Sequence, residues 1–180
     1  KYTINATIGG VALLPPNAVQ LDVRQGGNKF ELQSASYRPG RVTATITDGN
    51  GSPIPVKVEF IGDGETPTPN WGPESAEHFV RNLAYTADGT FTKPLQAGNY
   101  DIIVSHGPEH DAVFTRLTVT AGRTTKLEAT LPHSVKTPGW VSSDFHSHSS
   151  PSGDNTGSQK GRVLNLAAEN IEFAPCTEHN

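Results

Sequence analysis

The sequence has one cysteine, no methionine and no long apolar run. Because Cys176 is alone, an internal disulfide framework is excluded. No stretch approaches the roughly 18 uninterrupted apolar residues of a membrane-spanning helix, so the sequence predicts no membrane partner. Lys and Arg number 14 against 18 Asp and Glu, without a basic run, and this mildly acidic balance argues against a nucleic-acid partner.

The two ends of the sequence carry no direct targeting signal. It starts at Lys1 without a charged-then-apolar leader, so we expect that a native N-terminus has been removed. It stops at Glu178-His179-Asn180, directly after an apolar run, and we expect a fragment whose catalytic half is cut short.

Short strands are the main structural signal. Hydrophobic residues make up 34% of the chain, and its 18 Gly and 14 Pro are typical of strands joined by tight turns. Residues 42–46 and 56–60 alternate between apolar and polar, the pattern of strands with one buried face. The Asp-, Gly-, Asn- and Pro-rich run 48–53 between them predicts a hairpin. Further strands are expected at 83–85, 100–104, 113–119 and 127–131.

These strands predict a mainly β protein, with an antiparallel β-sandwich over residues 1–132 and an edge strand at 2–8. The runs Arg41-Val42-Thr43, 51–56 and 95–102 resemble the carboxypeptidase regulatory-like (transthyretin-like) sandwich. Trp71, in the polar loop 61–79, either stacks on a sugar or a partner, or packs back on the sandwich or on a neighbouring domain.

The pattern changes after Pro132. Residues 140–145 and 171–176 are expected to be strands, with a helix over 158–169 between them. On this helix Val163, Leu164 and Ala167 are expected to face inward, and Lys160 and Arg162 outward. Strand, helix and strand make a βαβ unit, so residues 133–180 predict a parallel sheet that begins a (β/α) barrel without closing it. Its uncovered apolar residues would lie against the sandwich, pair with another copy of the chain, or stay mobile.

The run Asp144-Phe145-His146-Ser147-His148 carries the clearest chemical signal. Residues i and i+2 of a strand project from one face, so His146 and His148 are expected to present two imidazoles to one point. Asp154 in the following loop and His179 at the end of the second strand would complete a mixed nitrogen and oxygen site. Such a site suits zinc, manganese or iron.

Other polar residues near this candidate site have less specific interpretations. Asp144 and Glu178 either orient an imidazole through its free N–H group or are ordinary polar residues at strand ends. Cys176 is a candidate ligand, but its place on the strand favours a small buried hydrophobe. The four remaining histidines have no ligand-like spacing, and each is interpreted as an ordinary surface or hydrogen-bonded residue: His78, His106, His110 and His133.

Residues 139–156, with 162–166 and 172–180, resemble the polymerase-and-histidinol-phosphatase (PHP) superfamily, and most closely its CehA/McbA-type metallohydrolases. The resemblance implies a distorted (β/α)₇ barrel behind a β-sandwich, and a hydrolase with two or three divalent cations. It implies that His146, His148, Asp154 and His179 are metal ligands. The later glutamate, histidine and Asp-x-His ligands of that family have no counterpart here, so we expect these 180 residues alone to be inactive.

Two hypotheses for the function remain. In the first, the chain is the N-terminal part of a hydrolase in which a metal-activated water attacks a small-molecule phosphoester, or a carboxyl or carbamate ester. In the second, it is a non-catalytic sandwich that binds a ligand or partner, with an incidental tail. We expect export to the periplasm or the extracellular space, because Thr-, Asn- and Gly-rich sandwiches are common in exported proteins and the resembled enzymes often carry leaders.

Overall fold

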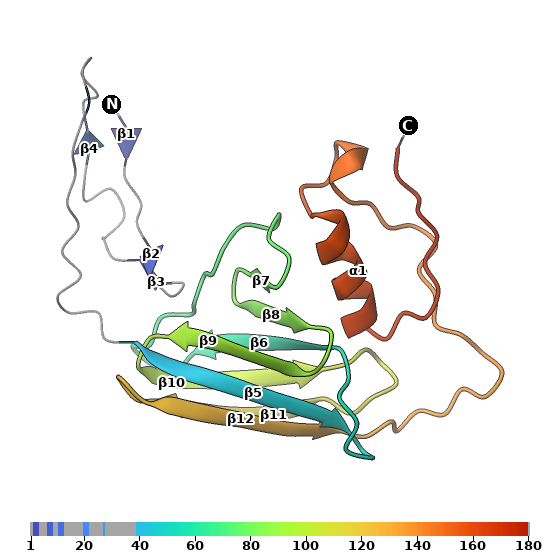
Figure 1. Ribbon diagram of the computed structural model, residues 1–180, viewed down its shortest axis with the longest axis horizontal. Coiled ribbons are helices and arrows are strands. Elements are labelled where there is room, and N and C mark those ends of the chain that lie inside the picture. Colours follow the sequence, from blue (N-terminus) through green and yellow to red (C-terminus); the bar gives the residue numbers. More distant parts are fainter. Residues whose placement is uncertain are drawn as a thin grey trace.

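The computed structural model describes residues 39–179, Gly27 and the backbone of four short strands near the N-terminus (Figure 1). These strands are β1 (Tyr2–Thr3), β2 (Thr7–Ile8), β3 (Val11–Ala12) and β4 (Gln20–Leu21). In the described backbone β1 pairs with β4 and β2 pairs with β3, both antiparallel. Within the edge strand expected over residues 2–8, β1 and β2 have different partners, and residues 4–6 lie outside the described part of the chain.

Two sheets make up the main body, which is mainly β as expected. The first has the order β11-β10-β6-β8-β7 and is antiparallel throughout. The second has the order β12-β5-β9, in which β5 and β9 are antiparallel but β5 and β12 are parallel, which corrects the purely antiparallel prediction. The strands are β5 (Gly40–Asp48), β6 (Val56–Gly62), β7 (Phe79–Val80), β8 (Leu83–Thr86), β9 (Thr90–Leu95), β10 (Gly98–Ser105), β11 (Val113–Val119) and β12 (Thr124–Leu131).

The predicted hairpin between β5 and β6 is wrong, because the two strands belong to different sheets. The turn itself is present: the Asp48 amide donates to the Ser52 carbonyl, and Thr47 and Pro53 form an isolated bridge. Pro53 and Pro55 have no N–H group, so the ladder cannot continue beyond this bridge. The chain instead arches from one sheet to the other, and each strand keeps one apolar face for the space between them.

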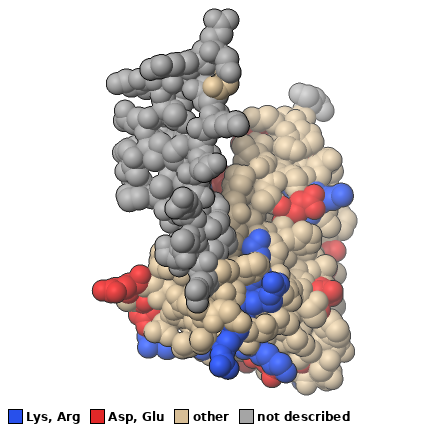
Figure 2. Space-filling model, turned by 60° about the vertical axis from the view of Figure 1, so that its left-hand side comes forward, with Lys and Arg blue, Asp and Glu red and all other residues tan. Residues whose placement is uncertain are grey.

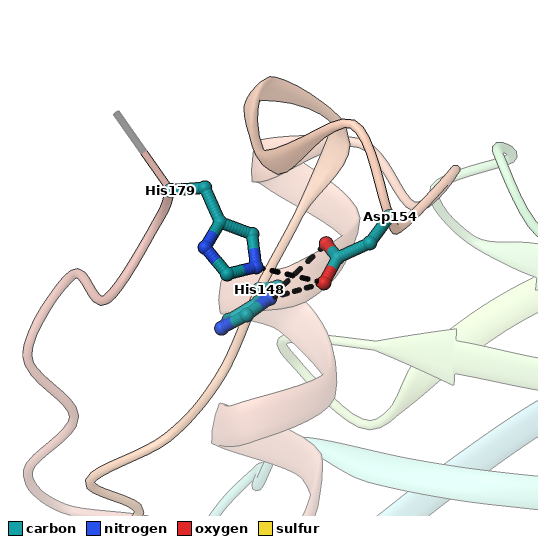
Figure 3. A group of neighbouring side chains, drawn as sticks. All are labelled: His148, Asp154 and His179. Atoms are coloured by element: carbon teal, nitrogen blue, oxygen red, sulfur yellow. Dashed lines mark hydrogen bonds and ion pairs between the residues drawn. The ribbon is translucent and has the colours of Figure 1, made fainter.

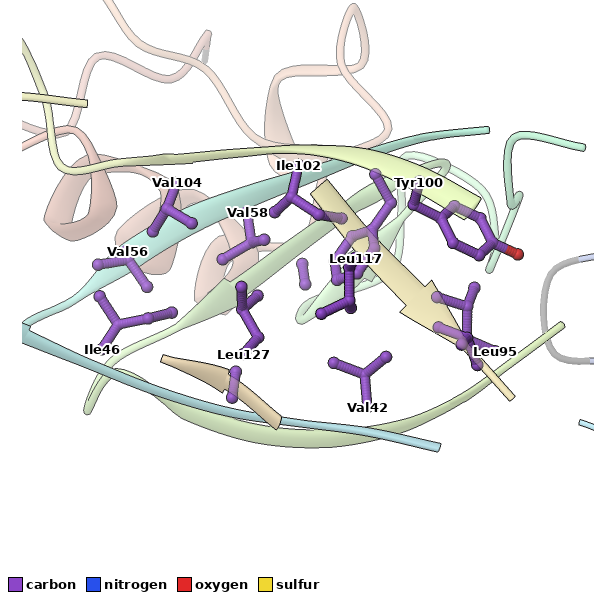
Figure 4. Close-up of a cluster of buried hydrophobic side chains, with 14 of the residues drawn as sticks. Val42, Ile46, Val56, Val58, Leu95, Tyr100, Ile102, Val104, Leu117 and Leu127 are labelled. Carbon is purple, nitrogen blue, oxygen red and sulfur yellow. The ribbon is translucent and has the colours of Figure 1, made fainter. Parts of the chain in front are cut away.

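That space is the hydrophobic core (Figure 4). Val42 and Ile46 enter it from β5, Val58 from β6, and Ile102 from β10, all nearly fully buried. The alternation read from the sequence therefore selects the inward faces correctly on both sheets. Burying a side chain of this size contributes about 1.5–3 kcal/mol relative to leaving it exposed, which makes this core the main source of stability.

Trp71 packs back on the sandwich, which confirms that interpretation. Its ring makes edge contacts with Phe60, at 5.1 Å between centroids, and with Phe79, at 5.6 Å. The ammonium group of Lys93 lies 4.0 Å from the centre of the Phe79 ring, a cation–π contact. The loop between β6 and β7 is thereby fixed against the sheet.

The helix expected over residues 158–169 is confirmed as α1 (Gln159–Ala168). Ser158 caps it, since the Ser158 hydroxyl accepts a hydrogen bond from the Gly161 amide at 2.9 Å. Its buried face consists of Gly161, Leu164 and Ala168, and this face lies against the sandwich. The inward placement of Val163 is wrong, because its side chain is 67% exposed.

The two strands expected around α1 are reduced to one parallel bridge between Ser143 and Phe173. The Phe173 amide donates to the Ser142 carbonyl, and the Asp144 amide to the Phe173 carbonyl, both at 3.1 Å. The direction is parallel as expected, but no longer strand forms among the described residues of this segment. The predicted burial of Cys176 is also wrong, since the thiol is free and exposed.

The end of α1 is anchored to the first sheet. Lys57 of β6 forms an ion pair with Glu169, directly after α1. His106, which follows β10, is buried, and its Nδ1 lies 3.3 Å from the Ala168 carbonyl. Gly107 has φ +67°, and a Cβ there would lie 2.1 Å from the Glu169 carbonyl oxygen. Only glycine therefore allows the chain to pass so close to the helix end.

Three of the histidines interpreted as ordinary lie together at this junction. The ring of His110 lies 4.5 Å from that of His106 and 4.8 Å from that of His133, between centroids. Burial lowers the pKa of His106 and of His110, and the neighbouring imidazole of the stack lowers each further. Glu109 joins the stack to the tail by accepting hydrogen bonds from Thr137 and Asn170.

The surface carries no segregated charge on the face shown in Figure 2, where basic and acidic side chains lie interspersed. Within the described part of the chain, no helix has the length and apolar character needed to cross a bilayer.

Candidate metal centre

Three of the predicted site residues converge on one point (Figure 3). The Nδ1 atom of His148 lies 3.1 and 3.0 Å from the two carboxylate oxygens of Asp154. The Nε2 atom of His179 lies 3.0 Å from Asp154 Oδ2. Taken together, one donor atom from each of the three residues lies within 4.8 Å of the others.

The loop between His148 and Asp154 brings these two residues together. It contains the short helix η1 (Ser150–Ser152), which ends at Gly153. Gly153 has φ +72°, a left-handed conformation that glycine adopts without steric cost, and it turns the chain so that Asp154 points back to His148. The Ser-Pro-Ser-Gly sequence thus places the carboxylate as its turn-forming residues predict.

His179 comes from a segment that runs beside residues 143–147 (Figure 1). The Ser147 amide donates to Thr177 Oγ1, and the Thr177 hydroxyl donates to the Ser147 carbonyl, each at 2.8 Å. One threonine side chain therefore replaces the backbone pairing that a longer strand would provide. Thr177 received no role from the sequence, and only its position two residues before His179 could have suggested one.

Glu178 fixes the loop rather than an imidazole. Its carboxylate accepts hydrogen bonds from the amide and hydroxyl of Ser149 and from the hydroxyl of Ser152. These bonds to the ionised form lower the pKa of Glu178 to about 2. The carboxylate is therefore ionised at neutral pH and holds the His148–Asp154 loop against the His179 segment.

Asp144 and His146 lie beside the converging group. Asp144 Oδ1 accepts a hydrogen bond from the His146 backbone amide at 3.0 Å, so it orients the chain and not an imidazole N–H. The His146 ring is exposed, and its centroid lies 4.8 Å from that of His148. Residues 144–148 do not form a strand, so strand geometry does not place the side chains of His146 and His148 on one face as expected.

The donor set fits a divalent cation of the zinc or manganese type. Bonds of about 2.0–2.2 Å to one tetrahedral cation place neighbouring donor atoms roughly 3.3–3.6 Å apart, near the 3.0–3.1 Å between each imidazole nitrogen and the Asp154 carboxylate. Hydrogen bonds from His148 and His179 lower the pKa of Asp154, so its carboxylate is ionised and can act as a ligand. Two imidazoles and one carboxylate also leave coordination positions open, as a catalytic site requires. The same distances satisfy hydrogen bonds from the two rings to Asp154.

Arg162 also belongs to this region, which the sequence did not predict. It was expected to face outward from α1, but its Nε donates to the His148 carbonyl at 3.0 Å and its side chain is partly buried. The contact spans fourteen residues and depends on how the loop folds over α1, so no local pattern could have revealed it.

Comparison with protein-family models and with curated proteins gives no match for this chain.

Proposed function

We propose that residues 133–179 provide part of the metal centre of a hydrolase of the PHP type, similar to the CehA/McbA metallohydrolases. The observation that carries this proposal is the convergence of His148, Asp154 and His179 within 4.8 Å. A further support is the parallel bridge between Ser143 and Phe173 across α1, which is the arrangement of a first βαβ unit. The two sheets in front would be the carboxypeptidase regulatory-like sandwich.

In this proposal His148, Asp154 and His179 bind one cation, and His146 beside them is available to a second. A bound divalent cation would supply Lewis-acid chemistry, making water acidic enough to give a nucleophile at neutral pH and polarising an ester oxygen. The role of the chain's own residues is to position the ligands. Glu178 holds the loop closed, Thr177 aligns the two segments, and Asp144 sets the backbone at His146.

The substrate class of the proposed hydrolase is a small phosphoester, or a carboxyl or carbamate ester. The described residues supply three converging ligands, whereas a centre of two or three cations needs more. We therefore expect the 180 residues alone to bind metal weakly and with little or no turnover.

Metal binding tests the proposal directly. Isothermal titration of the purified chain with zinc, and separately with manganese, is expected to give a stoichiometry near one for at least one of the two metals. The variants His148→Ala, Asp154→Asn and His179→Ala should each weaken binding at least tenfold. His78→Ala, which removes an exposed histidine of the sandwich region, is the matched control and should leave binding unchanged.

The second candidate, a non-catalytic binding module, is favoured by one feature of the first sheet. Phe114 is 75% exposed, and together with Ile61 and Ile103 it lines an open groove of about 550 Å³ on the outer face. Elemental analysis separates the two functions, since the module predicts no stoichiometric metal. A chain that binds neither zinc nor manganese, or that binds equally without His148 and His179, would contradict the hydrolase proposal.

A further inference from the structure

A cavity of about 180 Å³ lies between the sandwich and α1, beside the candidate metal centre. The sandwich contributes one wall through the segment that leads into β7 and through β8. The other wall is formed by the metal-site loop and the first half of α1. The residues important for its chemistry are Glu74, Val80, Tyr85, His148, Asn155 and Arg162.

One glycine favours the close approach of these walls. A Cβ atom at Gly161 would lie 3.3 Å from the Ala76 carbonyl oxygen, closer than most such contacts. Gly157 also faces this wall, where a Cβ atom would lie at an ordinary contact distance of 3.9 Å from the Glu74 carbonyl oxygen. At the other end of α1, the Lys57–Glu169 ion pair holds the helix to the sheet. The cavity is therefore built jointly by both parts of the chain.

His148 connects this cavity to the metal centre. It lines the cavity and is also one of the three converging residues. The hydrogen bond from Arg162 Nε to the His148 carbonyl fixes the guanidinium next to it. A ligand in the cavity would thus lie beside the group that the proposed function uses for hydrolysis.

The cavity lining contains one guanidinium, Arg162, and one carboxylate, Glu74. No ion pair joins Arg162 to a carboxylate of residues 39–179. Glu74, the acidic residue of the lining, is already paired with Arg81. A guanidinium is always charged, and a partly buried charge is stabilised by a partner of opposite sign. With one N–H group used by His148, the remaining donors of Arg162 are suited to an anion.

We propose that this cavity binds the anionic group of the substrate, a phosphate or a carboxylate, through Arg162. The assignment of the anion to a substrate rests on the proposed function, whereas anion binding itself can be tested without it. Pockets for drug-sized ligands occupy about 300–1,000 Å³, so a cavity of this size takes a small anionic group rather than a whole nucleotide. The sandwich would then determine specificity, because Val80 and Tyr85 limit the size of that group.

The test is an anion titration of the full 180-residue chain in the presence of EDTA, so that no metal contributes. Inorganic phosphate and acetate are added separately, and amide chemical shifts are followed by NMR. Saturable shifts at Asn155, Ser158 and Arg162 are expected for at least one of the two anions, and their relative affinity identifies the group.

Three variants make the anion test specific. Arg162→Gln should weaken binding of the anion at least tenfold, while Arg162→Lys, which keeps the charge but not the planar donor pair, should weaken it less. Arg116→Gln is the matched control, since Arg116 is an exposed arginine on β11 that pairs with Asp101. Val80→Phe should weaken binding by filling the cavity from the sandwich side without changing its charge.

The outcomes distinguish this inference from the proposed function. Zinc titration of Val80→Phe without anion should give the wild-type affinity within about twofold, because Val80 belongs to β7 on the sandwich side of the cavity. Anion binding in EDTA that is unchanged in Arg162→Gln, or the absence of saturable shifts with both anions, would overturn the anion site even if metal binds. Absence of metal binding by the wild-type chain would instead overturn the proposed function, and the result of the anion titration would still stand.

Discussion

The Glu178 carboxylate and the Ser149 backbone amide share a bifurcated hydrogen bond, with both carboxylate oxygens 3.0 Å from the nitrogen. The Ser149 and Ser152 hydroxyls add to it, so an ionised group closes the loop that carries His148 and Asp154. This contact separates two tasks within the candidate site. Three residues offer ligand atoms, and a fourth keeps them in place.

We predict that Glu178→Gln weakens metal binding without removing a ligand. The amide has one acceptor oxygen and no charge, so it cannot accept from the Ser149 amide and both hydroxyls as strongly. Loss of a group that supports ligands typically costs about 10–100-fold in metal affinity. Calorimetric titration measures the effect, with Glu172→Gln as the control. Equal affinity in both variants would show that the loop needs no such support.

We predict that stability falls as the pH drops below about 6.5, the ordinary histidine value. The pKa values of His106 and His110 are lowered in the folded state by burial and by the adjacent imidazole. The unfolded chain therefore binds more protons in this range, and the stabilisation present above pH 6.5 is lost on acidification. Glu109 faces the same stack, but the hydrogen bond from Thr137 and the contact with His133 lower its pKa, so it titrates at more acidic pH.

Urea unfolding at pH 7.5 and pH 5.5 measures this loss. His110→Asn is expected to reduce the difference between the two pH values, because it removes the central ring of the stack. His78→Asn, outside the stack, should leave the difference as in the wild type. A pH difference that is the same in all three proteins would contradict the assignment to the junction.

We predict that Gly107→Ala detaches α1 from the sandwich, whereas Gly122→Ala does not. The two glycines have nearly equal φ angles, +67° and +70°, so both substitutions carry a similar cost for a left-handed alanine, roughly 1 kcal/mol. Only at Gly107 would the new methyl group meet backbone, 2.1 Å from the Glu169 carbonyl oxygen. The comparison therefore isolates the steric term.

Hydrogen exchange measures this difference site by site. Amides of α1 should exchange faster in Gly107→Ala than in Gly122→Ala, and the core amides of β6 and β10 should exchange alike in the two. Equal protection of α1 in both variants would mean that the helix is held by other contacts, such as the Lys57–Glu169 pair.

We predict self-association through the apolar side of the tail. Phe145 and Phe173 lie with ring centroids 5.8 Å apart and are both exposed, and Trp140 nearby in the sequence is 81% exposed. Neighbouring exposed aromatic residues are typical of surfaces that bind a partner. Sedimentation velocity over a concentration series should show reversible association that Phe173→Ser weakens. Phe114→Ser, at the exposed phenylalanine of the sandwich, is the control and should not weaken it.

The local parts of the fold were predictable. Alternating residues predicted the inward faces of β5, β6 and β10, and the apolar spacing of residues 163–167 predicted α1 within one residue at each end, although it placed Val163 inward. These signals depend on residues close in sequence. The loop that brings Asp154 back to His148 was also predictable, because Gly153 and its serine and proline neighbours determine its turn locally.

Apart from the hairpin, the errors arose where distant segments decide the outcome. Residues 48–53 form the expected turn, but Pro53 and Pro55 direct the chain to a second sheet instead of a hairpin. His133, which follows β12, meets His106 and His110, which follow β10, because the segments after these two strands pair in a bridge between His110 and His133. Arg162 and Thr177 obtain their contacts in the same way, from the packing of one segment over another.

The parallel pairing of β5 with β12 also affects the order of events during synthesis. Thr124 pairs with Arg41 and Leu131 with Asp48, so the second sheet is complete only after nearly the whole sandwich region has left the ribosome. Residues 144–179 emerge next. The platform on which α1 rests can therefore be finished just before the ligand-bearing loops arrive, and these loops would meet a folded surface rather than an open chain.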